Sequence, residues 1–216
     1  MRFMINDTQN FFVDFDKAYI SPPAKLPWYI KLGAWLSRKI LKKDLMIPKI
    51  LAHYPKAAIS SGILESLVAH DDKEVTKRML KIIRVQVSIL VACPFCIDMN
   101  AFEYEKANLT RDEIESLQHH VAKECPSFSL KEQILIEYIN LVSATPIIIP
   151  KEMITRLKEH FSDRAIVIIA TTIAQVHYWA RFIRSVGIPV AGFGNICTLE
   201  SNATFHTNTK EQSNAK

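Results

Sequence analysis

Two cysteines three positions apart carry the chemistry that this sequence most clearly offers. They stand in the run Cys93-Pro94-Phe95-Cys96. A C-x-x-C pair is commonly used either as half of a zinc site or as a dithiol that is oxidised to a disulfide and reduced again. A third interpretation is that both thiols are buried as small apolar side chains.

The other candidate ligands favour redox chemistry over zinc. A structural zinc site needs two further ligands, usually a second closely spaced Cys/His pair. Cys125 and Cys197 are isolated, and the adjacent His119 and His120 lack ligand spacing. The five glycines form neither a G-x-G-x-x-G nor a G-x-x-x-x-G-K-[ST] motif, which excludes a glycine-built nucleotide cradle. We therefore expect a redox dithiol, with no metal and no cofactor.

The residues around the pair predict which cysteine reacts. Pro94 suits the first position of a helix, so a helix is expected to begin at Cys93. Cys96 then lies in the first turn, where unpaired N–H groups and the helix dipole lower the pKa of a thiol. We assign Cys96 as the nucleophile and Cys93 as the resolving cysteine.

Helical patterns occupy most of the chain. The segments at 81–91 and 165–176 are rich in β-branched residues, but each lies inside a longer run without Gly or Pro and is predicted to be helical. Thr110 with Glu113 and Ser129 with Glu132 have capping-box spacing. The remaining predicted helices are 27–43, 55–69, 150–160 and 162–186.

Composition and charge restrict the class of protein. The 216 residues are 49% hydrophobic and 23% charged, with a net charge of +5, as in an ordinary globular chain. The segment 27–43 contains five Lys and Arg residues and no acid, so it accounts for the surplus and nucleic-acid binding is not expected. No signal peptide and no run of about 18 uncharged apolar residues is evident. We expect a cytoplasmic protein.

The region around the cysteines resembles a known family. The run LKIIRVQVSILVACPFCIDMNAFEYEKANLTRDEIESLQ is similar to the alkylhydroperoxidase-D-like branch of the carboxymuconolactone decarboxylase family. The likeness continues through SLKEQILIEYINLVSATP, EHFSDRAIVIIATTIAQ and RFIRSVGIPV. It covers residues 50–190, which leaves 1–49 as an N-terminal extension with a basic amphipathic helix and 191–216 as a partly disordered tail.

The resemblance implies an all-α helical bundle that forms homo-oligomers and reduces peroxides as an antioxidant enzyme. In that family the second cysteine attacks the peroxide, the first closes a disulfide, and an external dithiol reduces the pair. A Glu twelve residues before the first cysteine and a His four after the second relay the proton. Here those positions hold Lys81 and Asn100.

This departure leads to a hypothesis about the site. Lys81 is expected to stabilise a thiolate by its charge, or else to lie on a solvated helix face, and Asn100 is expected to donate a hydrogen bond but no proton. His177 is a candidate for the missing imidazole, although a packing role is favoured. The alternatives to a peroxidase are a decarboxylase of the same fold and a module whose dithiol only senses redox state or is inert.

The basic helix 27–43 has two interpretations. Trp28, Leu32 and Trp35 fall on one arc and Lys31 and Arg38 opposite, which is the pattern of a membrane-surface helix. Docking on the protein's own domain or on a neighbouring subunit is favoured over membrane binding.

Overall fold

The computed structural model describes residues 17–67, 72–119 and 125–194, and within them it contains helices and no strand. This confirms the predicted all-α class. The α-helices are α1 (Trp28–Leu41), α2 (Ile47–Leu51), α3 (Pro55–Leu67), α4 (Lys77–Leu90), α5 (Pro94–Ala101), α6 (Arg111–Gln118), α7 (Leu130–Ser143), α8 (Lys151–His160) and α9 (Asp163–Ser185), and a short 3-10 helix spans Tyr104–Ala107.

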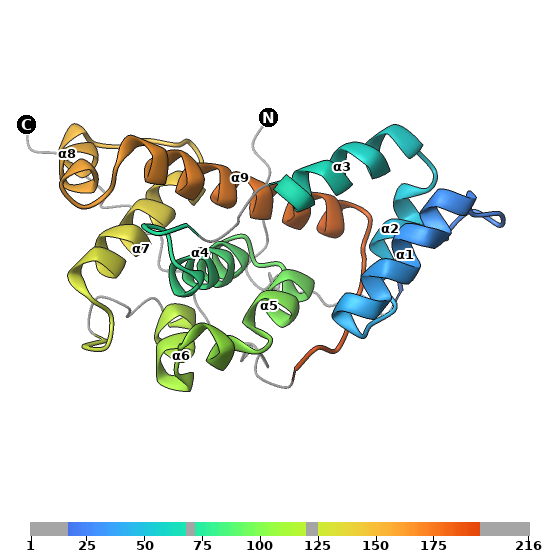
Figure 1. The fold of residues 1–216 in the computed structure, drawn as a ribbon, viewed down its shortest axis with the longest axis horizontal. Helices are drawn as coiled ribbons and strands as arrows, with labels where there is room; N and C mark the ends of the chain where they lie inside the picture. The colour runs from blue at the N-terminus through green and yellow to red at the C-terminus, as the bar shows by residue number, and fades with distance from the viewer. Residues whose placement is uncertain (1–16, 68–71, 120–124, 195–216) are drawn as a thin grey trace, which may run out of the picture.

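Helix α4 is the centre of the bundle, with α5, α6, α7 and α9 packed around it (Figure 1). Its residues Ile82, Ile83, Val85 and Val87 are fully buried. Its sequence is amphipathic, with Lys77, Lys81 and Arg84 on one side and the buried apolar residues on the other. The prediction of helices over 81–91 and 165–176 is confirmed, whereas α2 and the 3-10 helix were not predicted.

The helix starts follow the predicted capping signals. Thr110 and Ser129 each accept a hydrogen bond from the backbone N–H three residues on, and Glu113 and Glu132 accept one in return from the capping residue's N–H. Both predicted capping boxes are therefore present. These bonds satisfy backbone donors that a helix leaves unpaired at its first turn.

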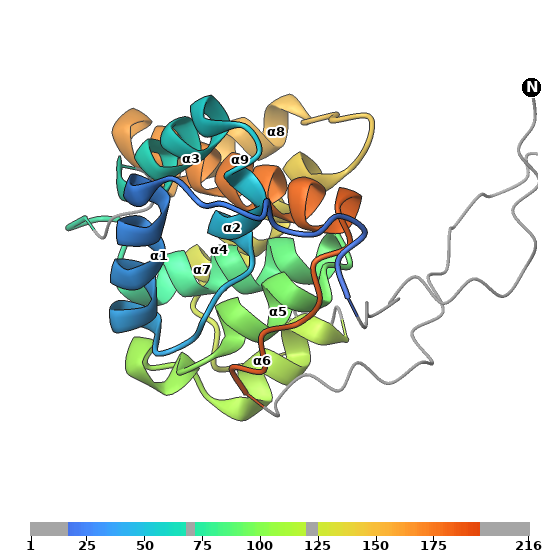
Figure 2. The same cartoon turned by 90° about the vertical axis from the view of Figure 1, so that its right-hand side faces the viewer.

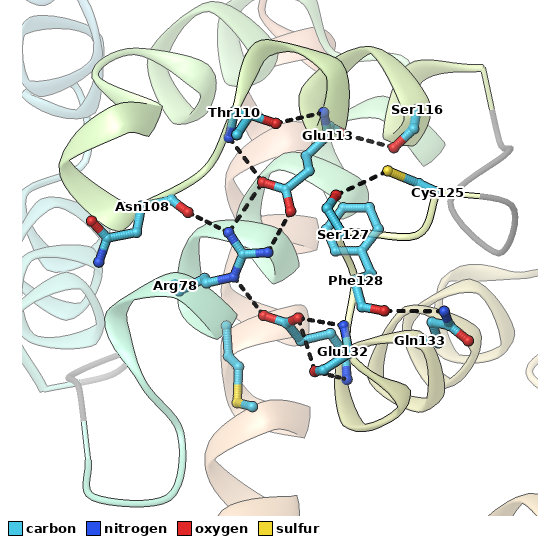
Figure 3. Close-up of polar contacts among 12 residues, drawn as sticks. Arg78, Asn108, Thr110, Glu113, Ser116, Cys125, Ser127, Phe128, Glu132 and Gln133 are labelled. Atoms are coloured by element: carbon cyan, nitrogen blue, oxygen red, sulfur yellow. Dashed lines mark hydrogen bonds and ion pairs between the residues drawn. The ribbon is translucent and has the colours of Figure 1, made fainter.

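A single arginine joins the two capping boxes (Figure 3). The Arg78 guanidinium lies 2.6 Å from a carboxylate oxygen of Glu113 and 2.6 Å from one of Glu132, and it also donates to the carbonyl oxygen of Asn108. Glu113 is 2% exposed, and burial alone would raise its pKa, but the bonds from Arg78 and Thr110 lower it overall. The bond to Glu113 raises the pKa of Arg78. This cluster, which we call the Arg78 cluster, ties the starts of α4, α6 and α7 together.

Helix α9 is the one helix in the described part of the chain that is long and apolar enough, at 23 residues, to cross a membrane. Length and composition are weak evidence by themselves, because a core helix meets the same test. In the structure α9 packs against α4, α5 and α7, and Ile169, Ile173 and Ile183 are buried in the bundle. The apolar residues on the inner side of α9 are thus accounted for by the core.

The N-terminal helix α1 does not dock by the arc that the sequence predicted. Trp28, Leu32 and Trp35 are 75%, 55% and 44% exposed, whereas Ile30 is buried. The helix packs beside α2 (Figures 1 and 2), so the side chains that the arc collects face away from the chain's own core. The protein's own domain therefore leaves Trp28, Leu32 and Trp35 largely exposed, and docking of this face on a neighbouring subunit stays a prediction.

Residues 187–194 follow α9 as an extended segment that runs across α5 (Figure 2). Phe193 in this segment is buried. Residues 191–194, which the sequence placed in the tail, are thus packed on the helical domain. The predicted disorder of the tail beyond them concerns 195–216, which lie outside the described residues.

Candidate functional site

Helix α5 begins at the cysteine pair, as the sequence predicted. Pro94 is its first residue and Cys93 is its N-cap, with a backbone in the extended region. Cys93 and Cys96 form a disulfide with Cα atoms 5.2 Å apart, within the usual range for such a bond. The backbone N–H of Cys96 points at Cys93 Sγ, 3.3 Å away, so the first sulfur is also the acceptor that caps the helix. This arrangement stabilises negative charge on Cys93 as well as on Cys96.

A tight turn connects the end of α4 to this N-cap. Ala92 has a φ of 48°, a left-handed conformation that is uncommon for a residue with a side chain. The turn is held at both ends: the Cys93 N–H donates to the carbonyl oxygen of Ser88 at 3.1 Å, and the Arg184 guanidinium donates to the carbonyl oxygen of Ala92. Cys93 is thereby anchored to α4 and α9 by backbone contacts.

Ser88 also fixes Asn100, and sequence reasoning missed it. Its hydroxyl accepts from the Asn100 side-chain amide at 2.9 Å and donates to the carbonyl oxygen of Arg84 at 2.6 Å. Asn100 therefore donates a hydrogen bond, but to α4. Ser88 lies seven residues after Lys81, on the same face of α4, and this helical spacing was the available signal.

Lys81 lies at the other end of α5 from the cysteines. Its ammonium donates to the carbonyl oxygen of Phe102 at 2.6 Å, one residue past the end of the helix. Phe102 is six residues beyond Cys96, or about 9 Å along a helix axis. Burial, and to a smaller extent the nearby Arg84, lower the pKa of Lys81 to about 8. The contact is that of a helix C-cap, and it does not support a charge role at the thiols.

Two other polar residues are used elsewhere. His177 Nε2 lies 3.1 Å from the hydroxyl of Ser143 at the end of α7, and burial lowers its pKa. This contact fits the packing role. The Asp98 carboxylate, two residues after Cys96, accepts the backbone N–H groups of Phe193 and Gly194, both at 2.9 Å.

The sulfur pair is enclosed by apolar side chains. Cys93 is 0% and Cys96 1% exposed. They belong to a buried cluster, separate from the main core, whose other members are Leu45, Ile47, Ile50, Leu51, Phe95, Ala180, Ile183, Ile188 and Phe193. Among the described residues, no group of three His, Cys, Asp or Glu side chains lies close enough to hold a metal ion. The site is thus a disulfide buried among apolar side chains at the N-terminus of α5.

An all-α bundle with a C-x-x-C disulfide capping a core helix defines a dithiol protein of the alkylhydroperoxidase-D-like class, and comparisons with known proteins agree. No family model matches the chain. It is 30% identical to the uncharacterized protein YdfG of Bacillus subtilis over 110 residues, which is 50% of this chain and 72% of YdfG. It is 21% identical to the uncharacterized protein YnjA of Escherichia coli over 177 residues, 82% of this chain and 96% of YnjA.

Solved structures extend the comparison. A protein of unknown function from Agrobacterium tumefaciens, described as a candidate antioxidant defence protein AhpD, is 26% identical with a TM-score of 0.58, over 65% of this chain and 95% of that one. A peroxidase-related protein with the AhpD core from Ralstonia eutropha is 17% identical with a TM-score of 0.70, over 82% and 94%. The debrominase Bmp8 is 15% identical with a TM-score of 0.61, over 77% and 88%, and shares the fold.

The chain therefore belongs to the alkylhydroperoxidase-D-like family. The match to the Ralstonia structure covers most of this chain, so the predicted helical bundle is confirmed. The solved structures that share this fold include peroxidase-related proteins and a debrominase.

Proposed function

We propose that this protein is a thiol-dependent peroxidase with an antioxidant role, in which Cys96 attacks the peroxide and Cys93 resolves the product. The observation that carries the proposal is the Cys93–Cys96 disulfide at the N-terminus of α5. A pair that bonds without displacing the helix can pass between its oxidised and reduced forms with little rearrangement.

The reaction balances in three steps. The Cys96 thiolate attacks one oxygen of a hydroperoxide ROOH, the O–O bond breaks, and with one proton from water the products are ROH and a sulfenic acid on Cys96. The Cys93 thiolate then attacks the Cys96 sulfur, forming the disulfide and releasing hydroxide, which takes a proton to become water. Finally an external dithiol reduces the disulfide and leaves as its own disulfide.

The geometry supports different tasks for the two sulfurs. The Cys96 N–H bond to Cys93 Sγ stabilises Cys93 as a thiolate, which suits both the resolving attack and its departure when an external thiol attacks Cys96. Asn100 is held by Ser88, and Lys81 caps the far end of the helix. In our proposal neither relays the proton, so it comes from solvent and turnover is slow.

Peroxide consumption by variants tests the proposal. Wild type, C96S, C93S and the control C125S would be supplied with cumene hydroperoxide and excess dithiothreitol. C96S is expected to lose turnover by roughly a thousandfold, as when a nucleophile is removed, while C125S keeps it. In a separate assay without dithiothreitol, C93S is expected to consume about one equivalent and stop as the sulfenic acid, whereas wild type stops as the disulfide. Undiminished turnover by C96S would refute the mechanism.

The two alternatives are separated by the same samples. Decarboxylation transfers no electrons, so the disulfide is an observation in favour of redox chemistry over it. A redox sensor or an inert pair is distinguished by counting: a sensor loses two thiols to one equivalent of peroxide but does not turn over with dithiothreitol, and an inert pair loses none.

We further propose that the chain assembles into homo-oligomers in the cytoplasm and that the exposed arc of Trp28, Leu32 and Trp35 meets a second copy. These large side chains lie close together on α1 and are each exposed by 44% or more in the single chain. Light scattering of wild type and a W28S/L32S variant tests this: a smaller assembly for the variant is expected, and equal masses would contradict it. Co-sedimentation with anionic vesicles, abolished by the same variant, would instead assign the arc to a membrane surface.

A further inference from the structure

The cysteine pair is covered by the two segments at the edges of the family resemblance. Leu45, Ile47 and Ile50 come from the N-terminal side, and Ile188 and Phe193 come from the C-terminal side. Together these segments, residues 45–51 and 187–194, form what we call the lid. They pack on the same apolar cluster as the sulfurs, and Cys93 and Cys96 are almost fully buried in it.

Few polar contacts hold the lid in place, and they centre on one carboxylate. Asp98 Oδ2 accepts the N–H of Phe193 and Asp98 Oδ1 accepts the N–H of Gly194, so both carboxylate oxygens are used on the lid. Hydrogen bonds to a charged acceptor are stronger than those between neutral groups. Asp98 lies half a turn beyond Cys96, which puts the latch and the nucleophile on the same short helix.

Lys43, two residues before the first half of the lid, contacts the second half. The Lys43 ammonium donates to the carbonyl oxygen of Gly192 at 2.5 Å, beside the ring of Phe193, whose centroid is 5.6 Å from that of Phe102. Earlier in the chain, the Tyr19 N–H donates to the carbonyl oxygen of Val186. The C-terminal half of the lid is thus held to α5 by Asp98 and to the N-terminal side of the chain by Lys43.

We propose that residues 45–51 and 187–194 gate access to the Cys93–Cys96 pair and that Asp98 is the latch of this gate. Backbone bonds tie Gly187 and Ile188 to the end of α9, whereas residues 189–194 are held by Asp98, by Lys43 and by the burial of Phe193. Breaking these few contacts releases residues 189–194 without unfolding the bundle. Opening admits the peroxide and the external dithiol, and closing keeps the oxidised pair dry. Asp98 is a positioning residue, since it acts through the lid and not on the reacting sulfurs.

The rate at which dithiothreitol reduces the disulfide tests this proposal. The full-length protein is oxidised with diamide, mixed with dithiothreitol, quenched with iodoacetamide at intervals and weighed by mass spectrometry, since reduction of the pair adds two alkyl groups. D98A is expected to be reduced roughly ten- to a hundredfold faster than wild type, because two charge-assisted bonds to the lid are lost. K43A is expected to be reduced severalfold faster.

The matched control is D72A, whose carboxylate also accepts a backbone N–H, that of Glu74, but far from the lid in sequence. Equal reduction rates for wild type, D98A and K43A would overturn the proposal, and so would an acceleration in D72A as large as that in D98A. K43A leaves Asp98 intact, so it decides the matter if D98A folds poorly by its thermal midpoint.

The inference rests on the proposed function for its purpose but not for its test. If D98A opens the pair to dithiothreitol while wild type consumes no peroxide, the gate stands and the peroxidase fails. If wild type consumes peroxide and the reduction rates do not differ, the peroxidase stands and the gate fails.

Discussion

The start of helix α4 and the turn just past its end stabilise their buried groups differently, by ion pairs at the start and by an apolar surround at the end. At its start, the Arg78 cluster pairs a guanidinium with the carboxylates of Glu113 and Glu132. Just past its end, Cys93 and Cys96 lie among apolar side chains and are joined to each other. Ions that are removed from water need partners of opposite charge, whereas a disulfide is neutral and tolerates an apolar surround.

The comparison indicates what each end is for. The Arg78 cluster fixes three helix starts and leaves its charged groups satisfied, so its substitution should change stability more than chemistry. The cysteine end has a neutral pair that becomes charged only when it is reduced, so its substitution should change chemistry more than stability. The following variants test this division, beginning with the largest expected effect.

Replacing Arg78 by Met should destabilise the fold most. It leaves two buried carboxylates without their partner, which typically costs about 3–5 kcal/mol. Urea unfolding would measure the loss, and peroxide turnover per folded molecule is expected to stay close to wild type. R156M is the matched control, because the pair that Arg156 forms with Glu137 is partly exposed and is worth about 1 kcal/mol or less. Equal losses of unfolding free energy in R78M and R156M would contradict the structural role of the Arg78 cluster.

Replacing Lys81 by Met should change how stability depends on pH. The folded-state pKa of about 8 is below the usual 10.5, so the folded state binds fewer protons between these values. The contribution of Lys81 to the unfolding free energy is therefore complete above pH 10.5 and is lost as the pH falls through 8. Between pH 8 and 10.5 the wild type should gain about 1–3 kcal/mol relative to K81M.

The control for this measurement is K77M, which removes an exposed lysine from the same helix. A difference between wild type and K81M that is constant with pH would show that Lys81 is as well solvated in the folded chain as in the unfolded one. A turnover loss in K81M beyond its loss of folded protein would instead place Lys81 with the cysteine end.

Replacing Ser88 by Ala should have the smallest effect on stability. It tests whether Ser88 belongs to the structural start of α4 or to the cysteine end. The side-chain bond to Asn100 is lost, which costs about 1 kcal/mol. Because Asn100 lies one turn beyond Cys96, turnover should also fall severalfold. The exposed S60A, which likewise loses a bond to a carbonyl within its helix, should change neither. A stability loss in S88A without a turnover loss would assign Ser88 to the structural region.

Local interactions explain what could be read from the residues alone. A capping box needs two residues three positions apart, so Thr110 and Glu113 predict a helix start without knowledge of the rest of the fold. The same holds for the helix at Cys93 and Pro94 and for the pairing of Cys93 with Cys96. Short sequence separation is the common reason.

Contacts between distant segments were decided only by packing. The sequence left two roles open for Lys81, a charge beside the thiols or a solvated helix face. In the structure its ammonium donates to the carbonyl oxygen of Phe102, just past the end of α5. Arg78 contacts Glu132, which is 54 residues further along the chain, and Asp98 contacts Phe193, which is 95 residues further along.

What the sequence by itself determined is thus the all-α class, the helix starts and the redox pair at one of them. What only the tertiary structure decided is which polar group meets which, and that segments from both ends of the described chain close over the sulfurs. Local hydrogen bonds depend on spacing along the chain, whereas burial depends on how every helix packs.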